Sequence, residues 1–171
     1  MISYVLTVLG DDRPGLVDSL SGVITEHGGN WERSQMARLG GKFAGIVQVN
    51  VPSAKAAELE AALTALSDEG SLDVRIHHAG SEPVAEGARF VLSLVGTDRP
   101  GLVHSVSAAL AQLGASIEEL DTATSHAPMS GGPLFEATAA VVLPRDVSID
   151  DVRDQLEALA DRLMVDIDLS S

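Results

Sequence analysis

Hydrophobic and polar positions along the first 80 residues predict alternating strands and helices. Residues 2–9 and 43–51 are rich in β-branched and aromatic side chains, which is typical of strands. Between these two segments, apolar residues recur with helical spacing on one stripe, which comprises Leu16, Val17, Leu20, Val23 and Ile24. A second helix is predicted to open at Pro52-Ser53, with Ser53 as its cap. Its core-facing positions are Ala56, Leu59, Leu63 and Leu66.

Turn residues separate these elements. Pro14 suits the first position of a helix, because its missing N–H removes no hydrogen bond there, and Gly28-Gly29 ends that helix. Gly40-Gly41 predicts a hairpin turn. Residues 30–39 carry polar side chains on both faces, and we assign this segment to a strand. Apolar and polar side chains alternate in residues 71–79, which predicts the closing strand. The order β-α-β-β-α-β predicts an α+β, ferredoxin-like fold: one antiparallel sheet with both helices on one face.

The chain contains this unit twice. Residues 4–39 align without a gap to residues 90–125, and 14 of the 36 aligned pairs are identical. The second copy carries six extra residues near 125–133, which predict a longer loop. Its second helix repeats the apolar spacing with Val152, Leu156 and Leu159. We therefore expect two domains, 1–79 and 89–171, joined by a small, polar linker at 80–88.

The charge balance narrows the classes of function. The chain of 171 residues has 11 basic and 25 acidic side chains, a formal net charge of −14, with only two lysines. Direct binding of nucleic acid is disfavoured, because phosphate contacts need clustered Lys and Arg. Cysteine is absent, and no apolar stretch is long enough to span a membrane. We expect a soluble, cytoplasmic protein without disulfides.

The longest run repeated without change is Asp12 to Val17, which returns as Asp98 to Val103. In both copies it joins a strand to a helix, and a helix start offers unpaired N–H groups and partial positive charge to a carboxylate. Asp12 and Asp98 could accept a hydrogen bond from an ammonium group, so the loop could receive a zwitterion, a free amino acid. Arg13 and Arg99 could instead clamp the carboxylate. The alternative is purely structural: Pro-Gly starts the helix and Asp12 caps it.

A β-α-β-β-α-β unit with a DRPG loop after its first strand resembles the ACT domain, a regulatory module that typically binds amino acids. Two units in tandem, the first opening with GDDRPGLVDSL, resemble the glycine cleavage system transcriptional repressor family. The resemblance implies ligand-binding residues in both loops: Gly10, Asp11, Asp12, Arg13, Pro14, Gly15, Leu16, Gly96, Thr97, Asp98, Arg99, Pro100, Gly101 and Leu102. The insertion around 126–132 could alter or cover the second site.

The same resemblance implies a regulator that senses an amino acid, glycine or serine being the first candidates. It would act through a protein partner such as a transcription activator, with a homo-oligomer also possible. The chain has no G-x-S-x-G elbow, phosphate-binding glycine loop or paired general acid and base. We therefore expect no enzyme activity, no cofactor and no metal site. Two alternatives stay open: a ligand-independent ACT scaffold, and a regulatory fragment like those of formyltetrahydrofolate deformylase or phosphoserine phosphatase.

Overall fold

A computed structural model describes residues 1–81, 86–126, 129 and 132–171. Its contacts divide the chain into two units, Met1–Glu82 and Pro83–Ser171. Strand β5 of the second unit begins at Gly87, two residues inside the stretch expected to be a linker. Residues 127, 128, 130 and 131 of the inserted loop expected in the second copy lie outside the described residues.

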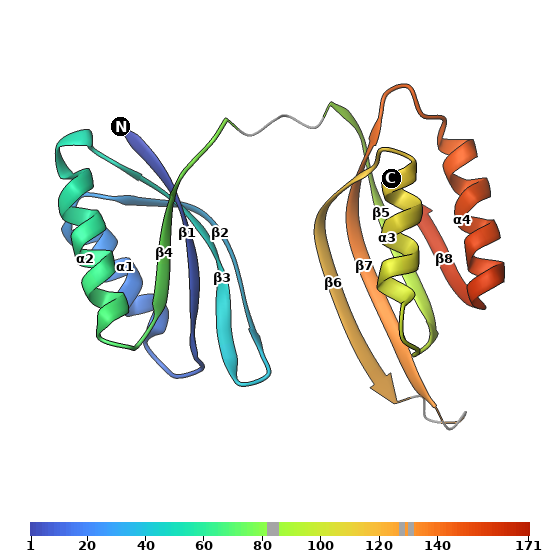
Figure 1. The fold of residues 1–171 in the computed structure, drawn as a ribbon, viewed down its shortest axis with the longest axis horizontal. Coiled ribbons are helices and arrows are strands. Elements are labelled where there is room, and N and C mark those ends of the chain that lie inside the picture. Colours follow the sequence, from blue (N-terminus) through green and yellow to red (C-terminus); the bar gives the residue numbers. More distant parts are fainter. Residues whose placement is uncertain (82–85, 127–128, 130–131) are drawn as a thin grey trace. The chain divides into compact units, whose positions relative to one another are not determined.

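The first unit is a four-stranded antiparallel sheet with strand order β2-β3-β1-β4. Both of its α-helices cover one face of that sheet (Figure 1). The elements are β1 (Ile2–Asp11), α1 (Leu16–Glu26), β2 (Asn30–Leu39), β3 (Lys42–Val51), a 3-10 turn (Ser53–Lys55), α2 (Ala56–Asp68) and β4 (Asp73–His78).

The second unit repeats the same arrangement, with strand order β6-β7-β5-β8 and both helices on one face (Figure 1). Its elements are β5 (Gly87–Thr97), α3 (Leu102–Gln112), β6 (Ser116–His126), β7 (Pro133–Pro144), α4 (Ile149–Leu163) and β8 (Val165–Ser170). The predicted α+β fold with two ferredoxin-like units is thus confirmed.

Each core lies between one sheet face and its two helices. In β1 the buried residues alternate as Tyr4, Leu6 and Val8, and those of α1 follow helical spacing as Leu16, Leu20 and Ile24. All predicted core positions of α2 and α4 are buried. The prediction was wrong for Val17, which is 45% exposed. Successive residues in a helix are rotated by about 100° about its axis, so the side chain of Val17 lies outside the stripe that contains Leu16 and Leu20. Val103 is likewise exposed in α3.

The polar pattern of residues 30–39 has a structural cause. This segment is β2, an edge strand whose pairing with β3 shifts register between Trp31 and Arg33. The shift leaves Glu32 as an extra residue in β2. Side chains that follow it therefore lie on the opposite face of the sheet from the one that simple alternation predicts. Strand β6 has the same irregularity between Ile117 and Glu119, so the bulge is part of the repeat.

Two local predictions have different outcomes. Gly40 and Gly41 both have positive φ, +58° and +77°, and form the predicted hairpin turn between β2 and β3. Ser53 does not cap the second helix. It lies in the 3-10 turn before α2, and its hydroxyl oxygen accepts a hydrogen bond from the terminal ammonium group of Met1 at 3.4 Å.

One polar group enters the first core. The Tyr4 hydroxyl donates a hydrogen bond to the Glu60 carboxylate on α2, and its ring lies 5.1 Å from that of His78. The hydrogen bond to Glu60, together with burial, raises the pKa of Tyr4 to about 12. In the second unit Phe90 stands at this position and has no hydroxyl group.

Candidate ligand-binding junctions

The first junction, residues 10–16, connects β1 to α1. Gly15 is the N-cap of α1, with φ +88° and ψ +3°, and no side chain caps the helix. The first bond of the helix runs from the Ser19 amide to the Gly15 carbonyl, at 2.9 Å. The amides of residues 16–18 precede that bond, so no carbonyl within the helix serves them. These amides carry the partial positive charge of the helix end.

The second junction, residues 96–102, has the same backbone geometry. Gly101 is the N-cap of α3, with φ +92° and ψ 0°, and again no side chain caps the helix. The Ser105 amide donates to the Gly101 carbonyl at 2.9 Å. The repeated sequence therefore produces the same uncapped helix start twice.

Both N-cap glycines face open space. A Cβ atom built on Gly15 or Gly101 would meet no atom within 4 Å. Their conformation explains why glycine is present, since left-handed φ values disfavour residues with a side chain. A side chain at either glycine would thus extend into open space without a steric clash.

Two other predicted site glycines have a packing role. A Cβ atom on Gly10 would lie 2.8 Å from Leu72 Cδ2 and 2.9 Å from the Ser71 carbonyl oxygen. One on Gly96 would lie 2.3 Å from Val165 Cγ1. Gly10 thus lets the residues just before β4 approach closely, and Gly96 does the same for β8. Leu16 and Leu102 are buried in the two cores, at 4% and 3% exposure.

Charged groups surround the first junction. Asp12 forms an ion pair with Arg38 of β2, with 2.7 Å between Oδ2 and Nε, and its amide donates to the Gly41 carbonyl. The alternative in which Asp12 caps α1 is therefore wrong. Asp11 pairs with Lys42, and the hydrogen bond from Lys42 lowers the pKa of Asp11. Arg13 is exposed, and its positive charge also lowers the pKa of Asp11.

At the second junction the arginine side chain has a partner and the aspartate side chain does not form an ion pair within the described residues. Arg99 is engaged: its Nη2 donates a hydrogen bond of 2.6 Å to the Leu163 carbonyl at the end of α4. Asp98 is exposed and forms no side-chain ion pair within the described residues, while its amide donates to the Pro133 carbonyl. Thr124 stands where the first unit has Arg38. The first junction thus offers a cation, Arg13, and the second an anion, Asp98.

A polar hollow of about 300 Å³ lies beside the first junction. Gly10 and Asp11 line it together with Lys42 and with Ser67, Gly70, Ser71, Leu72 and Asp73 from the end of α2 and the start of β4. Of the predicted first-junction residues, only Gly10 and Asp11 contribute to it. The sequence carried no signal for the α2–β4 residues, because only the fold brings them beside β1.

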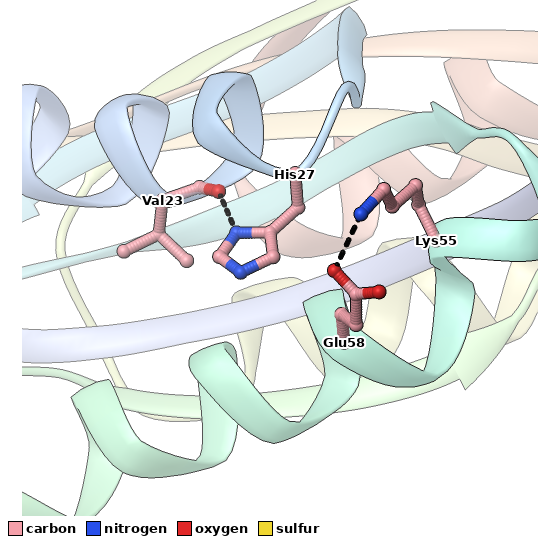
Figure 2. Close-up of polar contacts among 4 residues, drawn as sticks. All are labelled: Val23, His27, Lys55 and Glu58. Atoms are coloured by element: carbon pink, nitrogen blue, oxygen red, sulfur yellow. Dashed lines mark hydrogen bonds and ion pairs between the residues drawn. The ribbon is translucent and has the colours of Figure 1, made fainter.

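The opposite end of α1 carries a separate polar group of residues (Figure 2). His27 contacts the Val23 carbonyl through Nδ1 at 2.8 Å, and Lys55 pairs with Glu58 at 2.8 Å. The hydrogen bond from Lys55 lowers the pKa of Glu58. His27 follows the last turn of α1, so these residues do not contribute to the junction at its N-terminus.

Within the described ranges, no three His, Asp or Glu side chains are grouped so that they could hold a metal ion. In the same ranges, no helix is both long and apolar enough to cross a membrane.

Known proteins share this sequence pattern and this fold. The ACT domain family matches residues 3–77 and residues 88–170, one match in each unit. The chain belongs to the ACT domain family. A solved structure of an unknown protein from Galdieria sulphuraria is similar to this ACT protein, with 33% identity and a TM-score of 0.86. The similarity covers 99% of this chain and 97% of that one.

Two further similarities concern the tandem fold and the single domain. The structure of a candidate glycine cleavage system transcriptional repressor has a TM-score of 0.74 and 20% identity, and the similarity covers 99% of this chain and 96% of that one. A UPF0237 protein of Methanopyrus kandleri is 34% identical over 80 residues, which are 46% of this chain and 82% of the relative. The fold of the whole chain thus recurs in other solved structures.

Proposed function

We propose that this ACT protein is a regulatory sensor that binds a small amino acid at one or both junctions. Glycine and serine are the first candidates. Occupancy would change the affinity for a protein partner in the transcriptional regulation of amino-acid metabolism, in the cytoplasm. In this proposal no residue has a catalytic role, and no cofactor or metal takes part.

The observation that carries the proposal is the pair of helix starts that no side chain caps. Amides of residues 16–18 and 102–104 would donate to the ligand carboxylate, which the helix dipole also favours. Arg13 adds a cation at the first junction, and Asp98 adds an acceptor for the ammonium group at the second. Each junction therefore has amide donors for the carboxylate of a zwitterion and one further charged side chain, Arg13 or Asp98.

A thermal-shift panel of the common amino acids tests this proposal on the full chain. A ligand present at one hundred times its Kd stabilises the folded state by about 2.7 kcal/mol, which is readily measured. We expect glycine or serine to raise the unfolding temperature. The same measurement on Arg13→Met should show a smaller shift, whereas Arg33→Met, on the edge strand β2, should behave like the parent chain.

The net charge and the tandem fold support action through a protein partner. At −14 the chain is poorly suited to bind DNA directly, and the similar fold of a candidate glycine cleavage repressor agrees with a role in transcription. A ligand can switch the partner complex only if it binds the two states unequally. We therefore expect no mobility shift of DNA by the chain alone, and an amino-acid-dependent affinity for a DNA-binding protein.

The exposed edge strands favour one alternative, a ligand-independent scaffold. In β2 and β6 most side chains are exposed, and each strand pairs on one side only, with β3 or β7. Such an edge can add a strand from another chain. If no amino acid changes the unfolding temperature but the chain still associates with a partner through these strands, the scaffold explains the protein and the sensor does not.

A further inference from the structure

Each sheet has a second face, which no helix covers within the described residues of its own unit (Figure 1). We call these surfaces face 1, in the first unit, and face 2, in the second. Side chains alternate between the two sides of a strand. In β1 the buried Leu6 and Val8 point toward the helices, so Thr7 and Leu9 lie on face 1. The pairing register then assigns the residues of the other strands to each face.

The centre of face 1 is apolar. Ala37, Ala44 and Leu9 lie in one row across β2, β3 and β1. Leu9 is 47% exposed, and Ile46, the next residue of β3 on this face, is 48% exposed. On face 2 the position of Leu9 is taken by Val95, which is 40% exposed. Both faces therefore present apolar side chains that remain accessible.

The outer strands of the two faces carry opposite charges at matched positions. Arg33 on β2 and Glu119 on β6 occupy the same register position in the two copies of the repeat. The same holds for Arg75 on β4 and Asp168 on β8. All four residues are exposed. The two copies have thus diverged to opposite signs at both edges of the sheet.

The whole faces differ in the same sense, counted over the described residues without the bulges of β2 and β6. Face 1 has three cations and two carboxylates, a net charge of +1: Arg33, Lys42, Arg75, Asp11 and Asp73. Face 2 has one cation and five carboxylates, a net charge of −4: Arg89, Glu119, Asp121, Glu136, Asp166 and Asp168. Arg89 also pairs with Glu118 of β6 at 3.2 Å, which offsets its charge.

These charges favour contact between unlike faces. Face 2 on face 2 would bring five carboxylates against five, and face 1 on face 1 would bring the arginines at its edges together. Face 1 on face 2 places both arginine-bearing edges against carboxylates. Packed sheets align their strands within about 30°, and face 2 has carboxylates at both edges, so either direction of alignment is complementary.

The area of the faces favours a second copy of this chain as the occupant. Four strands, of which β4 and β8 have six residues each, give a face of roughly 20 Å by 20 Å, or about 400 Å². One contact would bury about 800 Å² in total, which is less than the roughly 1,200–2,000 Å² of stable interfaces. Each chain has both faces, so two copies can make the contact twice and bury about 1,600 Å².

We propose that face 1 of one copy packs on face 2 of a second copy, in a closed dimer that contains this contact twice. The apolar centres pack together, and opposite charges meet at the edges. The inference goes beyond the proposed function, because the contact needs no ligand.

Sedimentation equilibrium of the full chain over a range of concentrations tests the inference. We expect a reversible dimer whose Kd rises at least tenfold between about 50 mM and about 500 mM NaCl, because salt screens the attraction between exposed opposite charges. The net charge of −14 alone would give the opposite trend, since salt also screens the repulsion between two copies. The direction of the salt effect therefore separates the two causes.

Two charge-reversed variants test the contact itself. Arg33→Glu with Arg75→Glu makes face 1 acidic, and Asp121→Arg with Asp166→Arg and Asp168→Arg makes face 2 basic. Each variant alone should have a dimer Kd at least tenfold above that of the parent chain. An equimolar mixture of the two should dimerise again, because the acidic face 1 of one variant then meets the basic face 2 of the other, and their remaining faces are unchanged.

Arg153→Glu with Arg162→Glu is the matched control, since it changes the net charge as much as the face 1 variant does but lies on α4. Its dimer Kd should equal that of the parent chain. The mass of one chain at every concentration, an unchanged Kd in both reversed variants, or a mixture that stays monomeric would overturn the inference. If circular dichroism shows that a variant is unfolded, the parent chain still decides, because a Kd that salt lowers or leaves unchanged also overturns it.

Discussion

The conformation of Gly15 gives a quantitative prediction for Gly15→Ala. At φ +88° an L-residue with a side chain is disfavoured by about 1–2 kcal/mol. No atom lies within 4 Å of the added Cβ atom, so no steric clash adds to this cost. Alanine also lowers the conformational entropy of the unfolded chain, which favours the folded state by about 0.4–1 kcal/mol and partly offsets the backbone cost. We therefore expect the free energy of unfolding to fall by about 1 kcal/mol.

Urea unfolding followed by Trp31 fluorescence measures this change, because Trp31 is the chain's only tryptophan and lies in the first unit. Gly22→Ala is the matched control: it lies inside α1, its φ is not positive, and its Cβ atom would also meet nothing within 4 Å. Alanine there should stabilise the first unit by about 0.5–1 kcal/mol. If both substitutions stabilise the unit, the backbone explanation of the conserved run in the two copies is refuted.

Two remaining predictions concern Arg99 and Tyr4. Arg99→Met removes a charged donor from the Leu163 carbonyl, so we expect it to lower the free energy of unfolding in urea by about 1.5 kcal/mol. Arg13→Met should change this free energy by less than about 0.5 kcal/mol. Equal destabilisation by the two substitutions would contradict the different roles of the two arginines. The pKa of Tyr4 lies near 12 in the folded chain against an ordinary 10.0, so its stabilising contribution is complete below pH 10 and is lost as the pH rises to about 12. Tyr4 is the only tyrosine, so its absorbance titration measures that pKa directly, and a midpoint near 10 would exclude the hydrogen bond to Glu60.

The sequence predicted the fold correctly because the repeat, the helical stripes and the glycine turns all act locally. Gly40 and Gly41 adopt the expected turn, and the core positions of α2 are buried as their spacing implies. Strand β2 was harder to predict, because the bulge at Glu32 exchanges its faces and no residue type marks such a bulge. Val17 was placed in the core because it lies beside Leu16 in sequence, although helical geometry turns it outward.

The candidate site was only partly predictable for a different reason. The two hexapeptides are identical, so the sequence assigns equal roles to Arg13 and Arg99. Their partners come from segments distant in sequence: Leu163 binds Arg99, and Arg38 binds Asp12, while Thr124 leaves Asp98 without a counterpart.

Backbone amides at the two helix starts are the proposed binding groups, so amide chemical shifts of the ¹⁵N-labelled full chain report on them residue by residue. During titration with glycine and with serine, we expect the largest saturable shifts on residues 16–18, on residues 102–104, or on both. Saturable shifts confined to other segments, or spectra that neither amino acid changes, would refute binding at the helix starts.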